Sequence, residues 1–152
     1  MRKFHLYLII IFILFFLGSC ISLKIKSFIP PENQVENIEL CRKIDDSGEL
    51  LIPKEIQNEF TIDDKHVICF IRIKDISTRI TLRWKWYSPQ KMIARDTGDI
   101  VVNEGEKYLL ALTAYDKLQF LQEEKFDGKW TVVIFMNDKF IGKRNFRVTS
   151  SR

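Results

Sequence analysis

Apolar and polar residues alternate along much of this chain, and the alternation limits what the chain can fold into. The clearest run covers residues 80–87, where Ile, Leu and two Trp residues occupy every second position before Ser88 and Pro89 end it. Successive side chains of a β-strand point to opposite faces of the sheet, so a period of two predicts a strand with one buried face. A helix would instead repeat its apolar residues every three to four positions.

Similar runs predict further strands, and Asn137-Asp138 predicts a hairpin turn between two of them. A single helical turn is expected at residues 53–60. Seven or eight short strands separated by regular turn signals indicate an all-β fold, an antiparallel β-sandwich of immunoglobulin-like type. The further predicted strands are residues 39–44, 66–73, 92–95, 100–102, 108–115, 130–136 and 139–148.

The first 19 residues have the three parts of a secretory leader. Arg2 and Lys3 supply positive charge, residues 4–17 are apolar except for one His, and two small residues follow. A permanent membrane-spanning helix needs about 20 apolar residues, so this run is short for one. The chain therefore divides into a signal peptide (1–19), a tether (20–37) that contains two prolines, and a sandwich domain (38–152).

The end of this leader, Leu17-Gly18-Ser19-Cys20, resembles the lipobox of a bacterial lipoprotein signal peptide. The resemblance implies cleavage before Cys20, a diacylglyceryl thioether on its sulfur and an acyl group on the new amino terminus. Several chains are needed because one acyl chain binds membranes at only about 10⁴ M⁻¹. Ile21 in place of Asp favours the outer membrane over the inner one within this family. An uncleaved anchor and ordinary signal cleavage remain the alternatives.

The net charge of the mature chain argues against nucleic acid as a partner. The full chain has 24 Lys and Arg against 20 Asp and Glu, and removing Arg2 and Lys3 with the leader lowers its formal charge from +4 to about +2. Charge is nevertheless uneven, because residues 72–95 hold seven basic residues and a single Asp. Within this run Arg72, Arg83 and Lys85 form a candidate binding face, to which an exposed Phe70 would add. A solvated strand face is the alternative.

Cys41 and Cys69 are the two cysteines left after Cys20. The alternation places Cys69 with the core residues of its strand and Cys41 out of phase with Ile38 and Leu40. Two buried free thiols are therefore favoured, and a disulfide that closes the intervening loop, worth about 3 kcal/mol, is the alternative. No cofactor or metal site is expected, because the chain has no clustered metal ligands.

Catalytic groups are scarce in the mature chain, which points to a protein that is not an enzyme. His66 is its one histidine, and it follows Asp63 and Asp64 at the start of a strand, where an exposed turn residue is the simplest interpretation. No nucleophile elbow, phosphate-binding loop or zinc-protease motif occurs. A small hydrolase or metal enzyme built around His66 remains the least favoured alternative.

From about residue 38 to 149 the chain contains a set of structural residues in a fixed order: Leu40-Cys41, Gly48, Trp84, Trp86-Tyr87, Gly128-Lys129-Trp130-Thr131-Val132, Ile141-Gly142, Phe146 and Val148. This set resembles small sandwich modules of bacterial envelope proteins of unknown function. The resemblance implies ligand or protein binding at the envelope, or a spacer, and it supplies no catalytic residue. We therefore expect a lipid-anchored lipoprotein that binds a protein or saccharide, and the alternative is a structural subunit of an envelope complex.

Overall fold

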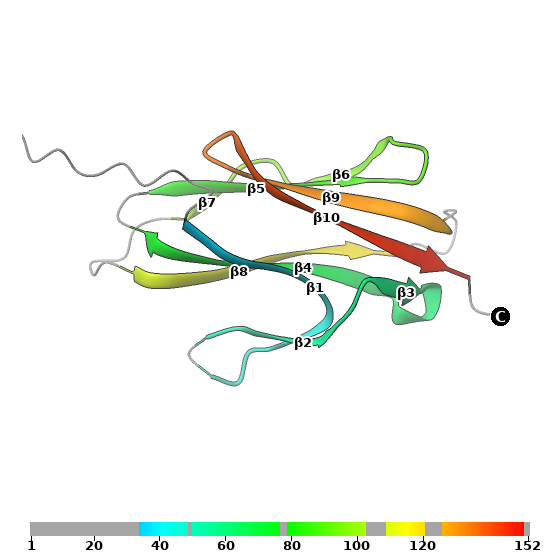
Figure 1. The fold of residues 1–152 in the computed structure, drawn as a ribbon, viewed down its shortest axis with the longest axis horizontal. Coiled ribbons are helices and arrows are strands. Elements are labelled where there is room, and N and C mark those ends of the chain that lie inside the picture. The colour runs from blue at the N-terminus through cyan, green and yellow to red at the C-terminus, as the bar shows by residue number, and fades with distance from the viewer. Residues whose placement is uncertain (1–33, 49, 77–78, 103–108, 121–125, 151–152) are drawn as a thin grey trace, which may run out of the picture.

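The structure is a computed structural model, and it describes residues 34–48, 50–76, 79–102, 109–120 and 126–150. The expected signal peptide and Cys20 lie outside these residues. The described residues form ten strands, which lie in two layers that face each other (Figure 1).

One layer is a four-stranded antiparallel sheet with β1 (Val35–Asp45) and β4 (His66–Ile76) at its centre. β2 (Ile52–Ile56) pairs with β1 on one side, and β8 (Leu109–Gln119) pairs with β4 on the other. β8 confirms that the Leu-rich run after residue 108 is a strand. β1 begins at Val35, inside the segment expected to be a tether.

The other layer is a six-stranded sheet in which β10 (Lys139–Thr149), β9 (Gly128–Met136) and β5 (Ile80–Tyr87) lie side by side. Asn137 and Asp138 join β9 to β10 with φ angles of 50° and 62°, which confirms the predicted two-residue turn. β3 is the one strand here that pairs in parallel, with β10. The shorter strands of this sheet are β3 (Glu59–Thr61), β6 (Ile93–Asp96) and β7 (Ile100–Val102).

The order of the long strands makes this sandwich immunoglobulin-like. β1, β4 and β8 lie together in one sheet in the manner of strands A, B and E, and β5, β9 and β10 lie together in the other in the manner of C, F and G. β6 extends the second sheet beyond β5, as strand C′ does in variable-type domains. The predicted all-β sandwich is therefore confirmed.

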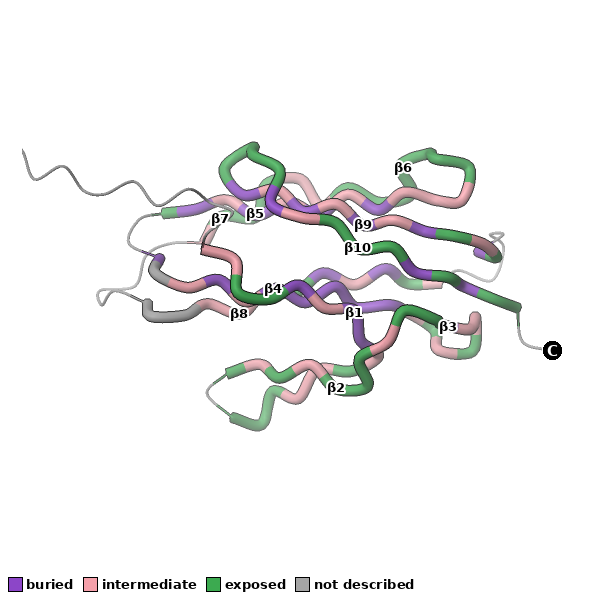
Figure 2. The backbone as a smooth tube through the Cα atoms, viewed as in Figure 1, coloured by how far each residue is buried: buried purple, intermediate pink, exposed green. Residues whose placement is uncertain are grey.

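The core lies between the two sheets and follows the predicted alternation. Every second residue of β5 is buried, including Trp84 and Trp86, and the residues between are half-buried (Figure 2). Phe146 of β10 is central to an aromatic group. Its ring centroid lies 5.8, 5.9 and 6.2 Å from those of Phe60, Trp86 and Trp130.

A second, smaller apolar cluster lies on the outer face of the four-stranded sheet. Cys41, Ile68 and Phe70 are buried there, with Ile44 and Leu51 packed against them. The β1–β2 hairpin lies below this sheet and away from the main core (Figure 1), so it covers side chains that would otherwise meet solvent. An exposed Phe70, which would have extended the candidate binding face, is therefore ruled out, because its outward position is covered.

The expected helical turn at residues 53–60 is also wrong. Residues 52–56 form the edge strand β2, where Pro53 is opposite Ile44, and an edge position tolerates a proline because one side of the strand needs no backbone donor. The chain then forms β3, and the one helical turn in this region is a 3₁₀ turn, η1 (Ile62–Asp64).

Candidate functional site

The candidate catalytic residue, His66, makes a structural contact. It is half-buried at the start of β4, and its Nε2 lies 3.1 Å from the carbonyl oxygen of Arg42. The neighbouring carboxylate of Asp64 accepts a hydrogen bond of 2.7 Å from the backbone N–H of Thr61 and lies 2.8 Å from Arg42 Nε. In the part of the chain that the structure describes, no three or more His, Cys, Asp or Glu residues are grouped so that they could hold a metal ion.

The three residues of the candidate binding face are not brought together. Arg72 lies on β4 of the four-stranded sheet, whereas Arg83 and Lys85 lie on β5 of the other sheet. Arg83 makes two hydrogen bonds of 2.7 Å to Asp96, and Lys85 lies 3.9 Å from the same carboxylate. Asp96 thus offsets much of the positive charge of these two residues.

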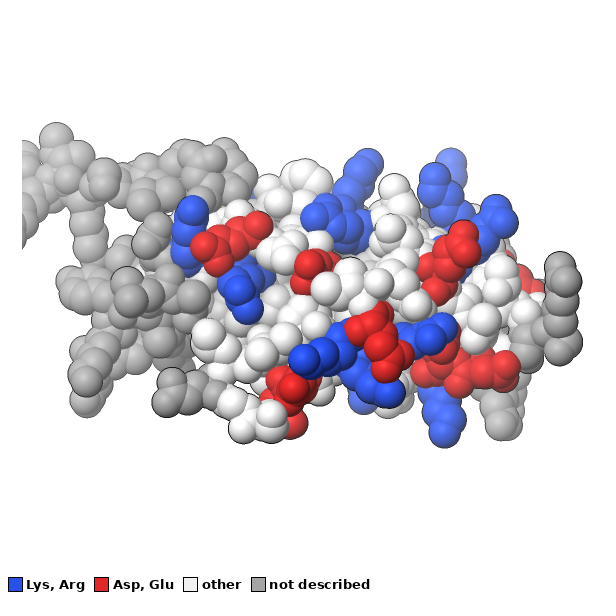
Figure 3. Space-filling model, turned by 60° about the horizontal axis from the view of Figure 1, so that its bottom comes forward, with Lys and Arg blue, Asp and Glu red and all other residues white. Residues whose placement is uncertain are grey.

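The four-stranded sheet carries a hollow of about 500 Å³ that crosses its outer face from β8 to β2. The described residues around it combine an apolar floor, an aromatic wall and a charged rim. Basic and acidic side chains are interleaved on this side of the molecule (Figure 3). The lining residues are Arg42, Lys43, Ile44, Glu55, Asp64, His66, Ile68, Tyr115 and Lys117.

The β1–β2 hairpin closes one side of this hollow through ion pairs. Arg42 and Lys43 follow each other on β1, and both reach Glu55 of β2. Arg42 lies against Asp64 and 3.8 Å from Glu55, and Lys43 Nζ lies 2.7 Å from Glu55. Glu55 has a φ of 56°, which turns the end of β2, and the backbone N–H of Gln57 then donates to the carbonyl of Leu40 at 3.0 Å. These contacts hold the rim in place without a ligand.

The β8 side of the hollow is open. Tyr115 is 44 % exposed, and Lys117, two residues further along the same face, makes no ion pair with a described residue. Tyrosine and arginine are enriched in binding hot spots, and a hollow of this size falls within the range of ligand pockets, about 300–1,000 Å³. The arrangement can bind an amphipathic group that places an apolar surface on Tyr115 and Ile68 and polar groups on the rim.

Sequence reasoning did not identify this hollow. Alternation in β8 marks Tyr115 and Lys117 as outward residues, but nothing local indicates that the β1–β2 hairpin comes to lie beside them. The one available signal was the acidic segment around Glu55 and Asp64, which provides partners for Arg42 and Lys43.

Cys41 and Cys69 are both free and both buried. Leu40 is opposite Cys69 and Cys41 is opposite Ile68, so the two thiols point to opposite faces of the four-stranded sheet. Cys69 belongs to the main core and Cys41 to the smaller cluster. Burial raises the pKa of the Cys41 thiol to about 11 and also raises the pKa of Cys69.

Over the residues that are described, no helix has the length and apolar character needed to cross a bilayer. No protein-family model matches the sequence, and no curated protein does. Two solved structures that match this chain have low sequence identity to it.

One such structure is the alkylpurine DNA glycosylase AlkC of Pseudomonas fluorescens bound to DNA with an abasic-site analogue, at 7% identity and a TM-score of 0.45. The match covers 60% of this chain and 27% of the glycosylase, so this chain corresponds to about a quarter of that protein. Another is an immunoglobulin-like protein of Pseudomonas aeruginosa, at 16% identity and a TM-score of 0.40, with 74% of this chain and 92% of that one covered. Both TM-scores are below 0.5, and the fold assignment rests on the strand order itself.

Proposed function

We propose that this protein is a bacterial envelope lipoprotein, held by lipid on Cys20, that binds a protein or saccharide partner in the hollow beside the β1–β2 hairpin. The outer membrane is the proposed location. The sandwich acts as a binding module and not as an enzyme.

The observation that carries the binding proposal is the open β8 side of the hollow. Tyr115 is exposed and Lys117 is half-buried beside an apolar floor, while the opposite rim is already fixed by the ion pairs of Arg42 and Lys43. A preformed rim lowers the entropy cost of binding, since fewer side chains become ordered when the partner arrives.

Two further observations support the rest of the proposal. The residues Leu17, Gly18 and Ser19 before Cys20 support lipid attachment. The engagement of His66 and Asp64 with Arg42 and Thr61 supports a role without catalysis, because these contacts give both side chains a structural purpose in joining β1 to β4 and η1.

Site-specific photo-cross-linking in intact envelopes tests the hollow. Tyr115 is replaced by the photoreactive p-benzoylphenylalanine, and Tyr87, which lies on the other sheet, is replaced in the same way as the matched control. We expect one dominant adduct from position 115 that position 87 does not give, with at least a fivefold lower yield when Lys117→Glu is added. Protease-sensitive added mass identifies a protein partner, and periodate-sensitive added mass identifies a saccharide.

Equal adduct patterns from the two positions, in variants that fold normally, would overturn the assignment of the hollow. The anchor is tested separately by incorporation of radiolabelled palmitate, which we expect in the natural chain and not in Cys20→Ala. Label in both proteins, or in neither, would remove the lipid anchor from the proposal.

A further inference from the structure

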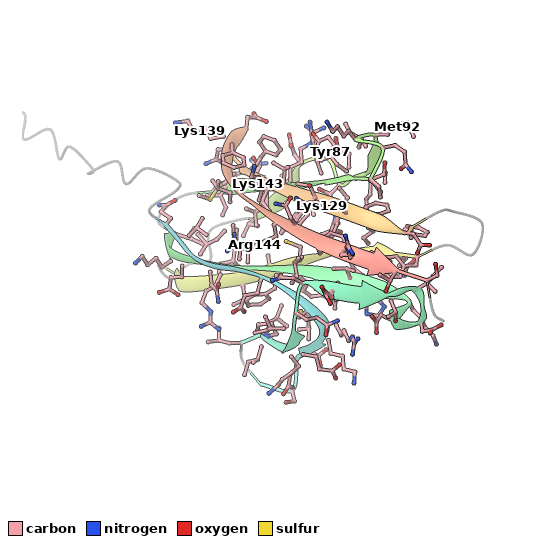
Figure 4. The ribbon with its side chains drawn as sticks, turned by 45° about the vertical axis from the view of Figure 1, so that its right-hand side comes forward. Tyr87, Met92, Lys129, Lys139, Lys143 and Arg144 are labelled. Atoms are coloured by element: carbon pink, nitrogen blue, oxygen red, sulfur yellow. The ribbon has the colours of Figure 1, made fainter. Side chains whose placement is uncertain are left out.

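β9 and β10 carry several cations that make no ion pair with a described residue. Between Lys129 and Thr149 the sequence has five Lys or Arg residues and a single acidic residue, Asp138. We use the name basic strip for four of these cations, none of which makes an ion pair with a described residue: Lys129, Lys143, Arg144 and Arg147. Figure 4 shows Lys129, Lys143 and Arg144 along these two strands.

The register of the six-stranded sheet gathers the basic strip. Arg147 is directly opposite Lys129, and Lys143 is opposite Val133, so all three side chains belong to the outer face. Arg144 lies at the margin, where its Nε donates to the carbonyl of Ile38 at 2.8 Å. The strip differs from the hollow side of the molecule, where the charges have mixed sign.

An exposed aromatic residue lies at one end of the strip. Phe140, which follows the β9–β10 turn, is 56 % exposed, and its ring centroid lies 6.5 Å from that of Phe135 on β9. Lysines beside an exposed aromatic residue suit the boundary between lipid headgroups and acyl chains, where apolar rings and cations both find favourable contacts.

The start of β1 lies at this same end of the sandwich. Ile38 of β1 contacts Gly142 closely enough that a Cβ on Gly142 would come within 2.4 Å of it, and Ile38 also accepts the hydrogen bond from Arg144. The β9–β10 turn and the beginning of β1 lie at one end in both ribbon views (Figures 1 and 4). The 15 residues from Cys20 to Val35 span at most about 50 Å.

We propose that the basic strip and Phe140 rest on the anionic phospholipid headgroups of the membrane that holds the anchor. This inference depends on the lipid anchor of the proposed function, because the anchor turns a weak contact into an intramolecular one. Each Lys or Arg near an anionic surface strengthens attraction roughly fivefold, so the strip alone accounts for a preference of about a hundredfold or more. The hollow on the other sheet then faces away from the bilayer.

Amine labelling of the full chain in vesicles tests this orientation. The protein is reconstituted in phosphatidylcholine alone or with phosphatidylglycerol, and acetylation of each lysine is followed by peptide mass spectrometry. Lys143 and Lys129 should react at least fivefold more slowly on the anionic vesicles and recover in high salt. Lys54, which lies on the edge strand β2 of the other sheet, should be unaffected.

Charge reversal supplies the matched variants. Lys143→Glu with Arg147→Glu should abolish protection of Lys129, whereas Lys54→Glu should leave it unchanged, and circular dichroism checks that each variant folds. Equal acetylation rates on the two kinds of vesicle would overturn the proposal. Protection in intact envelopes but not on anionic vesicles would also overturn it, because an acidic protein would then be the partner.

The same samples separate this inference from the anchor. The mass of the N-terminal peptide shows whether Cys20 is acylated. Acylation with equal labelling rates contradicts the strip and leaves the anchor intact. An unacylated chain contradicts the anchor. The comparison of labelling rates between the two vesicle types then tests the strip without the anchor.

Discussion

Two carboxylates, Asp116 and Asp96, show how single residues stabilise this sandwich. Asp116 on β8 is 7 % exposed and accepts hydrogen bonds of 2.7 Å from Trp86 Nε1 and of 2.9 and 2.7 Å from Arg95. Because β8 belongs to one sheet and both donors belong to the other, this buried carboxylate joins the two layers. Its negative charge is tolerated because three donors replace the lost water.

Asp116→Ala should lower the free energy of unfolding by about 2–3 kcal/mol, since it leaves the buried Trp86 N–H without an acceptor and Arg95 without its counter-charge. Arg95 is partly solvated, so the loss should not reach the upper range for buried pairs. Asp99→Ala is the control, because Asp99 makes only a solvated 3.8 Å contact with Arg83 and should cost less than about 1 kcal/mol. Urea unfolding measures both. Equal losses would show that Asp116 does not join the sheets energetically.

Asp96 should make stability depend on pH in acid. Hydrogen bonds from Arg83, with a further one from the backbone N–H of Gly98, lower the pKa of Asp96 from its ordinary 3.8 to about 2. A depressed folded-state pKa contributes stability above the unfolded value, and that contribution disappears as pH falls from about 4 to about 2. Asp96→Asn should therefore be less stable than the natural chain at neutral pH and equal to it near pH 2. Urea denaturation at each pH measures the two free energies of unfolding. A difference between them that stays constant from neutral pH to about pH 2 would contradict this role of Asp96.

The β1–β2 hairpin is the element that gives one face of this sandwich its character. It covers Phe70 on the outer side of the four-stranded sheet, contributes Cys41 to the cluster there, and provides the rim of the hollow. The cluster beneath it contains three buried residues, compared with 21 in the main core, so the hairpin should open at a smaller free-energy cost than the sandwich unfolds.

Thiol labelling should detect this opening. Cys41 lies on β1, opposite Ile56 of the edge strand β2, and Cys69 lies in the main core. Low concentrations of urea that release β2 should therefore make Cys41 reactive before Cys69. Both thiols should react slowly in the native protein, because burial raises the pKa of each and so lowers the thiolate fraction. Peptide-resolved mass spectrometry after alkylation measures the two rates. Simultaneous labelling of both would mean that the hairpin opens only with the whole domain.

The same hairpin marks where prediction from the sequence stopped. The alternation in β5 and the Asn137-Asp138 turn are local, and both predictions are confirmed. The burial of Phe70 depends on a hairpin folding over a sheet face, which no local period encodes. The candidate binding face in the basic segment 72–95 could not be judged from the sequence for the same reason. Arg83 binds Asp96, 13 residues away, and Arg72 lies in the other sheet.

At the scale of the whole molecule, the two outer faces differ in a way that matches the proposed anchor. One face combines the hollow with charges of both signs, and the other has the single-signed basic strip close to the start of β1. A tethered domain with one cationic face has a preferred orientation on an anionic surface, because its electrostatic energy is lowest when that face lies nearest the surface. In the two proposals, anchoring, orientation and partner binding use separate parts of one chain.

The main core should nevertheless unfold as one unit. Trp84, Trp86 and Trp130 are all buried in it. Tryptophan fluorescence therefore follows the separation of the two sheets and not the opening of the hairpin. Small single domains usually unfold in one cooperative step, and the midpoints from fluorescence and from far-ultraviolet circular dichroism should therefore coincide. Phe146→Ala removes the ring that lies between Phe60, Trp86 and Trp130. It should lower the free energy of unfolding by about 3–5 kcal/mol and shift both midpoints together. Separated midpoints in the natural chain would show that the two sheets do not share one cooperative core.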